Sequence, residues 1–370
     1  MYRKICLFLT LFLAYTIFAA FVFSSEGNRI PIIKVKGNHY QVGYQIGIQM
    51  KRQLHELLQQ SKDYVSEKTD LKWEDIRAQS QVLLEYSKKY MPEYVEEIQG
   101  AADATGIDLV DLFSEMCEEI YSKNYLKGCS DLIASDDVTA DGSVLAAHNN
   151  DTSPRLEKYA VVIHYQVEEE PEILAVGYGG LAISVGYNSA GISLTGNELS
   201  MNDMKMGVPR LLLVRKILAA KTIAEAIDAA IFQPRASNYN QVITDKNGEI
   251  YSIEGSAADY EALYATDGYL VHTNHYISPR MRKYELDPYD ITSSMVRYNR
   301  ANRLMKKNLG KISLEMMKKI LQDHVSRPKS LCRHGKNTKT TFSVIINLTE
   351  KAMYLARGNP CESEYYKYTF

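Results

Sequence analysis

The residues best able to do chemistry in this chain surround one cysteine. Cys129 follows Gly128, and Asp151 lies 22 residues further along. If the Gly128–Cys129 bond were cut, Cys129 would carry both a thiol and a free α-amine. An α-amine has a pKa of about 7.7–8.0, so it can accept the thiol proton near neutral pH. The sequence therefore predicts a nucleophile and its base on one residue.

The predicted secondary structure changes from helical to β-rich at Cys129. The chain before Cys129 has charged, helix-like patterns, and the chain after it has short apolar runs between turn residues. Many strands with several helix pairs predict two sheets covered by helices. We expect helices over residues 46–67, 73–90, 92–105, 108–124, 210–220, 223–230, 294–308 and 313–323. The main expected strands are residues 130–135, 143–147, 159–167, 172–178, 182–186, 191–195, 240–245, 249–254, 269–273, 342–348 and 352–356.

The composition is that of a globular protein. The chain has 370 residues, of which 45% are hydrophobic and 24% charged, with a formal net charge of −2. This charge argues against a nucleic-acid partner. The five cysteines show no zinc-type spacing, so we expect no metal site, and the expected chemistry needs no organic cofactor. Cys117 and Cys332 are expected to be buried thiols, with two disulfides left open by the cysteine count.

The N-terminus predicts a targeting segment. Residues 1–4 are basic, residues 5–23 are almost all apolar, and small and polar residues follow. We expect residues 1–25 to be a secretory signal peptide, or a signal anchor that holds the protein in a membrane through residues 5–23. Both alternatives place the remaining chain in the secretory pathway, as a secreted or lumenal protein.

A series of short motifs resembles one enzyme family, the acyl-coenzyme A:6-aminopenicillanic acid acyltransferases, which are N-terminal nucleophile hydrolases. The insect β-alanyl-amine hydrolases look like relatives in the same family. The resemblance implies an α+β fold, an αββα sandwich whose two stacked, mostly antiparallel sheets lie between helix layers. The motifs are residues 37–47, 92–100, 128–130, 186–191, 238–240, 253–255, 272–275 and 330–334.

The resemblance also implies a self-cleaving precursor. A helical segment, residues 26–128, would be released from a catalytic segment, residues 129–370, by cleavage of the Gly128–Cys129 bond. The two fragments would stay associated, so that residues 26–370 form one folded unit.

Site residues are carried over one by one. Cys129 would be the nucleophile, Asp151 a nearby active-site carboxylate, Asn274 a side-chain donor of the oxyanion hole, and Arg333 an arginine near the active site. Glu254 matches a family position to which we assign no role. The first four residues also have structural alternatives. Cys129 could be a buried thiol and Asp151 a turn residue. Asn274 could be a structural amide within a sheet, and Arg333 a buried ion-pair partner.

A two-histidine metal site is not expected near Asn274. His272 and His275 flank it, but residues an odd number apart on a strand point to opposite faces of the sheet.

The predicted function is that of a self-processing N-terminal-cysteine amidohydrolase or acyltransferase. It would act on the linear amide of a small-molecule substrate or acyl donor, through a thioester on Cys129. Hydrolysis is favoured, because acyl-coenzyme A is scarce outside the cytosol. The alternative is a non-catalytic binding protein, secreted or membrane-anchored, on the same fold. A papain-like protease is disfavoured, because the residues around Cys129 lack that enzyme's sequence context.

Overall fold

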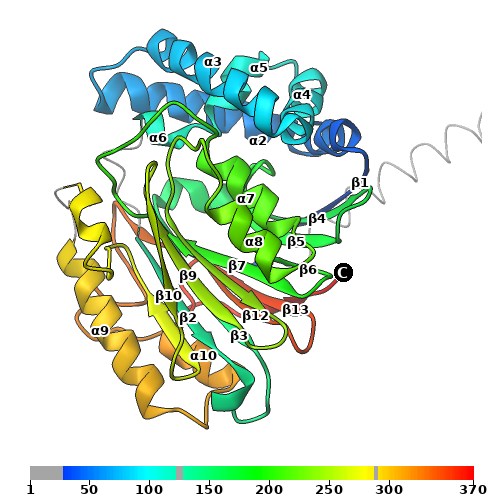
Figure 1. Ribbon diagram of the computed structural model, residues 1–370. Coiled ribbons are helices and arrows are strands. Elements are labelled where there is room, and N and C mark those ends of the chain that lie inside the picture. The colour runs from blue at the N-terminus through cyan, green and yellow to red at the C-terminus, as the bar shows by residue number, and fades with distance from the viewer. Residues whose placement is uncertain (1–27, 122–127, 287–290) are drawn as a thin grey trace, which may run out of the picture.

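Two stacked β-sheets form the centre of the protein in the computed structural model, which describes residues 28–121, 128–286 and 291–370 (Figure 1). The expected signal or anchor, residues 1–25, lies outside the described residues. Within the described residues, none of the helices combines the length and the apolar character needed to cross a membrane.

The larger sheet has eight strands in the order β1-β4-β5-β6-β7-β8-β9-β10, and the smaller has six in the order β11-β2-β3-β12-β13-β14. Neighbouring strands are antiparallel except for β1, which pairs with β4 in parallel. The strands of the larger sheet are β1 (Ile32–Gly37), β4 (Ala160–Val167), β5 (Ile173–Tyr178), β6 (Ala182–Asn188), β7 (Ile192–Asn197), β8 (Asn240–Asp245), β9 (Ile250–Gly255) and β10 (Tyr260–Tyr264). Those of the smaller sheet are β2 (Gly128–Ala134), β3 (Leu145–Thr152), β11 (Tyr269–His272), β12 (Lys339–Asn347), β13 (Ala352–Arg357) and β14 (Tyr366–Tyr368).

Helices cover the outer face of each sheet (Figure 1). The outer face of the larger sheet shares one apolar core with α2 (His39–Lys68), α3 (Trp73–Tyr90), α4 (Pro92–Thr105), α5 (Leu109–Ser114), α6 (Glu118–Tyr121), α7 (Arg210–Leu218) and α8 (Ile223–Ala230). The outer face of the smaller sheet packs on α9 (Ile291–Lys307) and α10 (Leu314–Leu321). A third core fills the space between the sheets, with Val162 and Val185 from one and Ile133 and Val344 from the other. The predicted αββα sandwich is therefore confirmed.

The first strand comes from the helical part of the chain. β1 precedes Gly128 in sequence, yet it forms the edge of the larger sheet, whose other strands all follow Cys129. The sheet thus contains strands from both sides of the expected cleavage site. Backbone hydrogen bonds of this kind favour continued association of two fragments.

Close helix packing accounts for the early glycines. A Cβ built on Gly43 would lie 1.7 Å from the carbonyl oxygen of Glu97, and one built on Gly47 would lie 2.7 Å from the Cβ of Ala104. Any side chain at either position would force α2 and α4 apart. Close packing of α2 on α4 therefore requires glycine at both positions.

Some expected boundaries were wrong. α2 begins at His39 rather than residue 46, because Asn38 and Gln41 form a reciprocal capping box. The helix expected over residues 108–124 is divided into α5 and α6, and residues 122–124 lie outside the described residues. The short strands β10 and β14 were not expected, since edge strands carry weak apolar patterns.

Candidate active site

Cys129 is the second residue of β2 and is 7% exposed. Alternate residues of a strand point to the same face, so Cys129 and Asp131 share the face of Ile133. Ile133 belongs to the core between the two sheets. The Cys129 thiol therefore faces the space between the sheets, near the end of β2 that follows residues 122–127, which the structure does not describe.

Asn274 contacts the backbone of Cys129 directly. The Cys129 N–H donates to the side-chain carbonyl oxygen of Asn274 at 2.8 Å, and a guanidinium nitrogen of Arg297 donates to the same oxygen at 2.9 Å. The Asn274 side-chain NH₂ donates to the carbonyl of Glu198 at 3.0 Å. These partners fix the orientation of the amide. Asn274 thus presents its oxygen to the Cys129 nitrogen, and its NH₂ group, the donor that the expected oxyanion role would use, is bonded to Glu198.

Glu254 anchors the segment that carries Asn274. Its buried carboxylate accepts hydrogen bonds from the backbone N–H groups of Ile277, at 2.6 Å, and Ser278, at 3.0 Å. His272 lies 2.9 Å from the same carboxylate. Glu254 therefore positions the residues on both sides of Asn274, a role that the sequence did not suggest.

The two histidines that flank Asn274 have separate partners. His272 is held between Glu254 and the side chain of Asn197, both at 2.9 Å. The Nδ1 atom of His275 lies 2.7 Å from the hydroxyl of Ser294. Each of the two rings is therefore held by its own hydrogen-bonding partners.

Asp151 and Arg333 lie against Gly128. A Cβ built on Gly128 would be 2.5 Å from Nη1 of Arg333 and 3.3 Å from Oδ2 of Asp151. β2 and β3 pair so that Gly128 stands opposite Asp151, whose Oδ1 accepts a 2.7 Å hydrogen bond from Thr340. Burial raises the pKa of Asp151, and the nearby Arg333 and Arg297 oppose that change. Only glycine leaves room for these two side chains beside the expected cleavage site.

A buried ion pair that we did not predict lies next to Cys129. His148 Nδ1 is 2.7 Å from Asp131 Oδ1, and both side chains are almost completely buried. Burial disfavours the charged imidazole, but Asp131 and Cys129 outweigh it and raise the pKa of His148 to about 10. His148 is therefore an imidazolium at neutral pH. The only sequence signal was Asp131 two residues after the cysteine, on the same strand face.

Arg297 is the second residue that sequence reasoning missed. This buried arginine of α9 donates to the main-chain carbonyl of Cys129 and, at 2.8 Å, to the hydroxyl of Ser130. It also donates to the Asn274 side chain, so one guanidinium contacts the Cys129 carbonyl, the Ser130 hydroxyl and the Asn274 amide. Nothing in the sequence of α9 distinguishes Arg297 from the other arginines of that helix.

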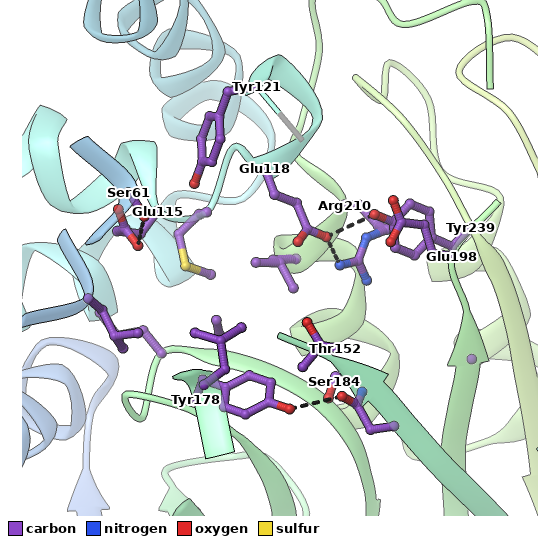
Figure 2. Close-up of a pocket in the computed structure, with 18 of the residues that line it drawn as sticks. Ser61, Glu115, Glu118, Tyr121, Thr152, Tyr178, Ser184, Glu198, Arg210 and Tyr239 are labelled. Atoms are coloured by element: carbon purple, nitrogen blue, oxygen red, sulfur yellow. Dashed lines mark hydrogen bonds and ion pairs between the residues drawn. The ribbon is translucent and has the colours of Figure 1, made fainter. Parts of the chain in front are cut away.

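A pocket opens beside Cys129 between the helical layer and the sheets (Figure 2). One wall comes from helices that precede Gly128, and the other from strands that follow it. The apolar wall includes Leu54, Leu57, Leu112, Met116, Leu181 and Leu211. The polar lining includes Glu115, Glu118, Asn150, Asp151, Tyr178, Glu198, Arg210 and Tyr239. Both expected fragments therefore contribute to the same pocket.

Acidic side chains outnumber basic ones in this pocket. Glu118 forms an ion pair with Arg210 and accepts a 3.2 Å hydrogen bond from Tyr239, as Figure 2 shows. Glu115 and Glu198 add two further carboxyl groups. Burial raises the pKa of Glu115 to about 7, so it titrates near neutrality. The pocket favours a substrate with a cationic or hydrogen-bond-donating group over one with several phosphates.

Comparisons with known proteins identify the family of this chain. Residues 138–362 match the family model described as acyl-coenzyme A:6-aminopenicillanic acid acyl-transferase. The match contains Asp151, Asn274 and Arg333 and begins after Cys129.

Two curated relatives are similar in sequence. The acyl-coenzyme A:6-aminopenicillanic-acid-acyltransferase 40 kDa form of Emericella nidulans is 22% identical over 322 residues, which cover 85% of this chain and 88% of the relative. The β-alanyl-dopamine/carcinine hydrolase of Drosophila melanogaster is 26% identical over 257 residues, which cover 61% of this chain and 64% of the relative. The chain thus spans slightly less than two thirds of the Drosophila protein.

Two solved structures show weaker likeness. A mutant conjugated bile acid hydrolase from Clostridium perfringens has a TM-score of 0.43 and 14% identity, covering 65% of this chain and 97% of that one. Penicillin V acylase from Agrobacterium tumefaciens has a TM-score of 0.38 and 11% identity, covering 61% of this chain and 82% of that one.

Proposed function

This chain belongs to the acyl-coenzyme A:6-aminopenicillanic acid acyl-transferase family, and we propose that it is a self-processing amide-cleaving enzyme whose nucleophile is Cys129. Its class is that of acyltransferases and amide hydrolases with an N-terminal nucleophile. The observation that carries the proposal is the 2.8 Å hydrogen bond from the Cys129 nitrogen to Asn274. That nitrogen becomes the α-amine after cleavage, and it already has a side-chain acceptor in the uncut chain.

The proposed cleavage proceeds through a thioester. The Cys129 thiol attacks the Gly128 carbonyl, the C–N bond breaks, and the thiol proton passes to the departing nitrogen. Water then hydrolyses the thioester, which leaves a carboxylate on Gly128 and restores the thiol beside a free α-amine. The absence of a side chain on Gly128 leaves its carbonyl uncrowded and lets Arg333 approach.

The charged neighbours fit this chemistry. The His148 imidazolium and the Arg297 guanidinium place positive charge near Cys129, where the proposed attack develops negative charge on the carbonyl oxygen. A protonated His148 cannot serve as the general base, so in turnover that task falls to the Cys129 α-amine. Asn274 and Arg297 would orient this amine and the adjacent carbonyl.

Turnover would use the same thiol on a small-molecule amide. Cys129 attacks the substrate carbonyl, the amine leaves with a proton from the α-amine, and water releases the acid. We favour hydrolysis of an N-acyl or N-aminoacyl amine over transfer from acyl-coenzyme A, because the pocket holds more carboxyl groups than cations. We also propose that residues 1–25 direct the protein into the secretory pathway. This location favours hydrolysis too, because acyl-coenzyme A is scarce outside the cytosol.

Intact mass spectrometry of the purified full chain tests the proposal. Wild-type protein should give two fragments, one beginning at Cys129, and Cys129→Ala should give one uncut chain. Cys117→Ala is the matched control, because it removes a buried free cysteine outside the pocket and should still be cut. A wild-type chain that stays whole would refute self-processing and leave the non-catalytic binding protein as the better account.

A further inference from the structure

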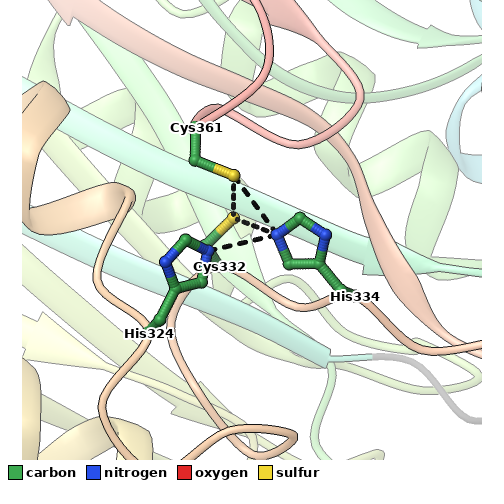
Figure 3. Close-up of side chains that lie close together, drawn as sticks. All are labelled: His324, Cys332, His334 and Cys361. Atoms are coloured by element: carbon green, nitrogen blue, oxygen red, sulfur yellow. Dashed lines mark hydrogen bonds between the residues drawn. The ribbon is translucent and has the colours of Figure 1, made fainter.

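Four side chains with metal-ligating atoms converge behind the candidate active site. They are His324, Cys332, His334 and Cys361, and one nitrogen or sulfur atom from each lies within 4.8 Å of all the others (Figure 3). His324 follows α10, Cys332 and His334 precede β12, and Cys361 lies between β13 and β14. Three separate segments of the chain thus meet at one point.

Four of the six distances between these atoms are close to the edges of a tetrahedron around zinc. The two sulfurs are 3.6 Å apart, the two Nε2 atoms are 3.1 Å apart, and His334 Nε2 lies 3.4 and 3.2 Å from the sulfurs of Cys332 and Cys361. Zinc bonds of about 2.3 Å to sulfur and about 2.0–2.1 Å to nitrogen at tetrahedral angles give edges of about 3.8 Å for S–S, 3.5 Å for S–N and 3.3 Å for N–N. These four edges agree to within about 0.4 Å. The other two edges, from His324 to each sulfur, are at most 4.8 Å long.

Outer contacts of the cluster also suit a metal. The Asn359 side-chain NH₂ points at the Cys332 sulfur at 3.5 Å, and it can stabilise a thiolate. A carboxylate oxygen of Glu362 lies 3.6 Å from Nδ1 of His334, the ring nitrogen that faces away from the cluster. Ligating histidines commonly have a carboxylate at this second nitrogen, because it fixes the ring and raises the basicity of the ligand.

We propose that His324, Cys332, His334 and Cys361 form a closed, tetrahedral zinc site. Two cysteines and two histidines are a donor set that zinc prefers, and four protein ligands leave no position for a substrate or reactive water. Binding would release the two thiol protons. The site is structural: it joins the chain after α10 to the chain after β13.

The site would act on the candidate active site through Arg333. This arginine lies between the ligands Cys332 and His334, and its Nη1 reaches the space next to Gly128. Ligation on both sides would hold the backbone of Arg333 in place. Fixed in this way, Arg333 is a positioning residue for the cleavage site, and this consequence rests on the proposed function. Zinc binding itself does not depend on it.

A disulfide between Cys332 and Cys361 is the competing explanation. A disulfide would not explain why the imidazole nitrogens of His324 and His334 converge on the two sulfurs, whereas a zinc ion would bind all four atoms. We expected no metal from the spacing of the cysteines alone. The ligands are separated by 8, 2 and 27 residues, so the site exists only in the folded chain.

Metal analysis of the full chain, expressed with zinc in the medium, tests the site without any activity measurement. We expect one zinc per chain, in wild type and in the uncut Cys129→Ala variant alike. Replacement by cobalt(II) should give the visible spectrum of a tetrahedral ion with thiolate ligands. Substoichiometric zinc with no such spectrum would overturn the proposal. So would a non-reducing peptide map that joins Cys332 to Cys361.

Variants separate ligation from general damage to the fold. His324→Ala and Cys361→Ser change exposed residues and should weaken zinc binding by more than the roughly 10- to 100-fold typical for loss of an outer partner. His55→Ala and Cys117→Ala, which lie outside the cluster, should retain one zinc per chain. Zinc content unchanged in both ligand variants would exclude this site. Retained zinc with failed self-cleavage would refute the proposed function alone.

Discussion

His148 lies 2.7 Å from Asp131 across the β2–β3 pair, and the two side chains form a buried ion pair on the strand face of Cys129. A charge held beside Cys129 would have two effects. It would stabilise the fold through Asp131, and it would supply positive charge where the proposed reaction forms an oxyanion. The two effects can be measured separately.

The first prediction concerns stability against pH in the uncut Cys129→Ala background. Asp131 and Cys129 both raise the pKa of His148 above its ordinary value of 6.5, and in this background Asp131 remains to do so. The contribution of His148 is therefore fully present below pH 6.5 and is lost as the pH rises above that value. We expect His148→Asn to remove this pH-dependent part of the unfolding free energy, which is about 1.4 kcal/mol for each unit by which Asp131 raises the pKa.

Urea unfolding at several pH values measures this difference. The double variant Asp131→Asn/His148→Asn is the control, because it leaves no unpaired buried carboxylate. Parallel stability curves for the His148→Asn variant and its parent would show that His148 is not charged in the folded protein.

The second prediction separates the two ends of the Asn274 amide. Asn274→Asp keeps an acceptor for the Cys129 nitrogen, whereas Asn274→Ala removes it. We expect self-cleavage to slow by about 100-fold in the alanine variant, the order seen for loss of one positioned group, and by less than about 10-fold in the aspartate variant. Intact mass recorded over time during cell-free synthesis gives both rates. Equal slowing would show that the NH₂ group, the donor of the expected oxyanion role, matters more than the oxygen.

The third prediction concerns Gly128. The Cβ of Gly128→Ala would lie 2.5 Å from Nη1 of Arg333, so the guanidinium must move away. Cleavage should slow although Cys129 is intact. Because both changes act on one contact, the effects of Gly128→Ala and Arg333→Ala on the cleavage rate should not add in the double variant. Strictly additive effects would mean that Arg333 does not act at Gly128.

The fourth prediction concerns a buried carboxyl group behind the pocket. Burial raises the pKa of Glu119 from 4.5 to about 7. The folded protein then holds a proton that the unfolded chain has lost, so this contribution to stability is present below pH 4.5 and disappears as the pH rises to about 7. In the uncut background, we expect Glu119→Gln to flatten the curve by about 3 kcal/mol over that interval.

Unfolding experiments between pH 4.5 and 8 provide the measurement. Glu96→Gln, on the exposed side of α4, is the matched control and should leave the shape of the curve unchanged. A curve of the same shape in Glu119→Gln would show that Glu119 is ionised throughout this range.

Several elements were predictable because their signals are local. α3 and α4 begin and end where expected, and α4 shows why: Pro92 occupies its first turn and Gly106 ends it with a φ of +78°. These preferences depend on a few neighbouring residues. The start of α2 was missed although the same kind of signal, the Asn38–Gln41 capping box, was present.

The candidate site was predictable only as a set of residues. Cys129, Asp151, Asn274 and Arg333 all lie around the Gly128–Cys129 bond. Their contacts were a different matter. The ion pair of His148 depends on the register of β2 against β3, and the hydrogen bonds of Arg297 depend on how α9 packs on the smaller sheet. Neither the strand register nor the helix packing can be recognised from a periodic pattern in the sequence.

The sequence by itself indicated two sheets covered by helices, because apolar periodicity is a property of the chain. The order of its short motifs carried the resemblance to the family, and with it the αββα fold. Only the tertiary structure decided that Asn274 offers its oxygen to Cys129 and that His324, Cys332, His334 and Cys361 meet. The physical reason is that long-range contacts follow from strand register and helix packing. Both result from burial of the whole core, which no short stretch of residues specifies.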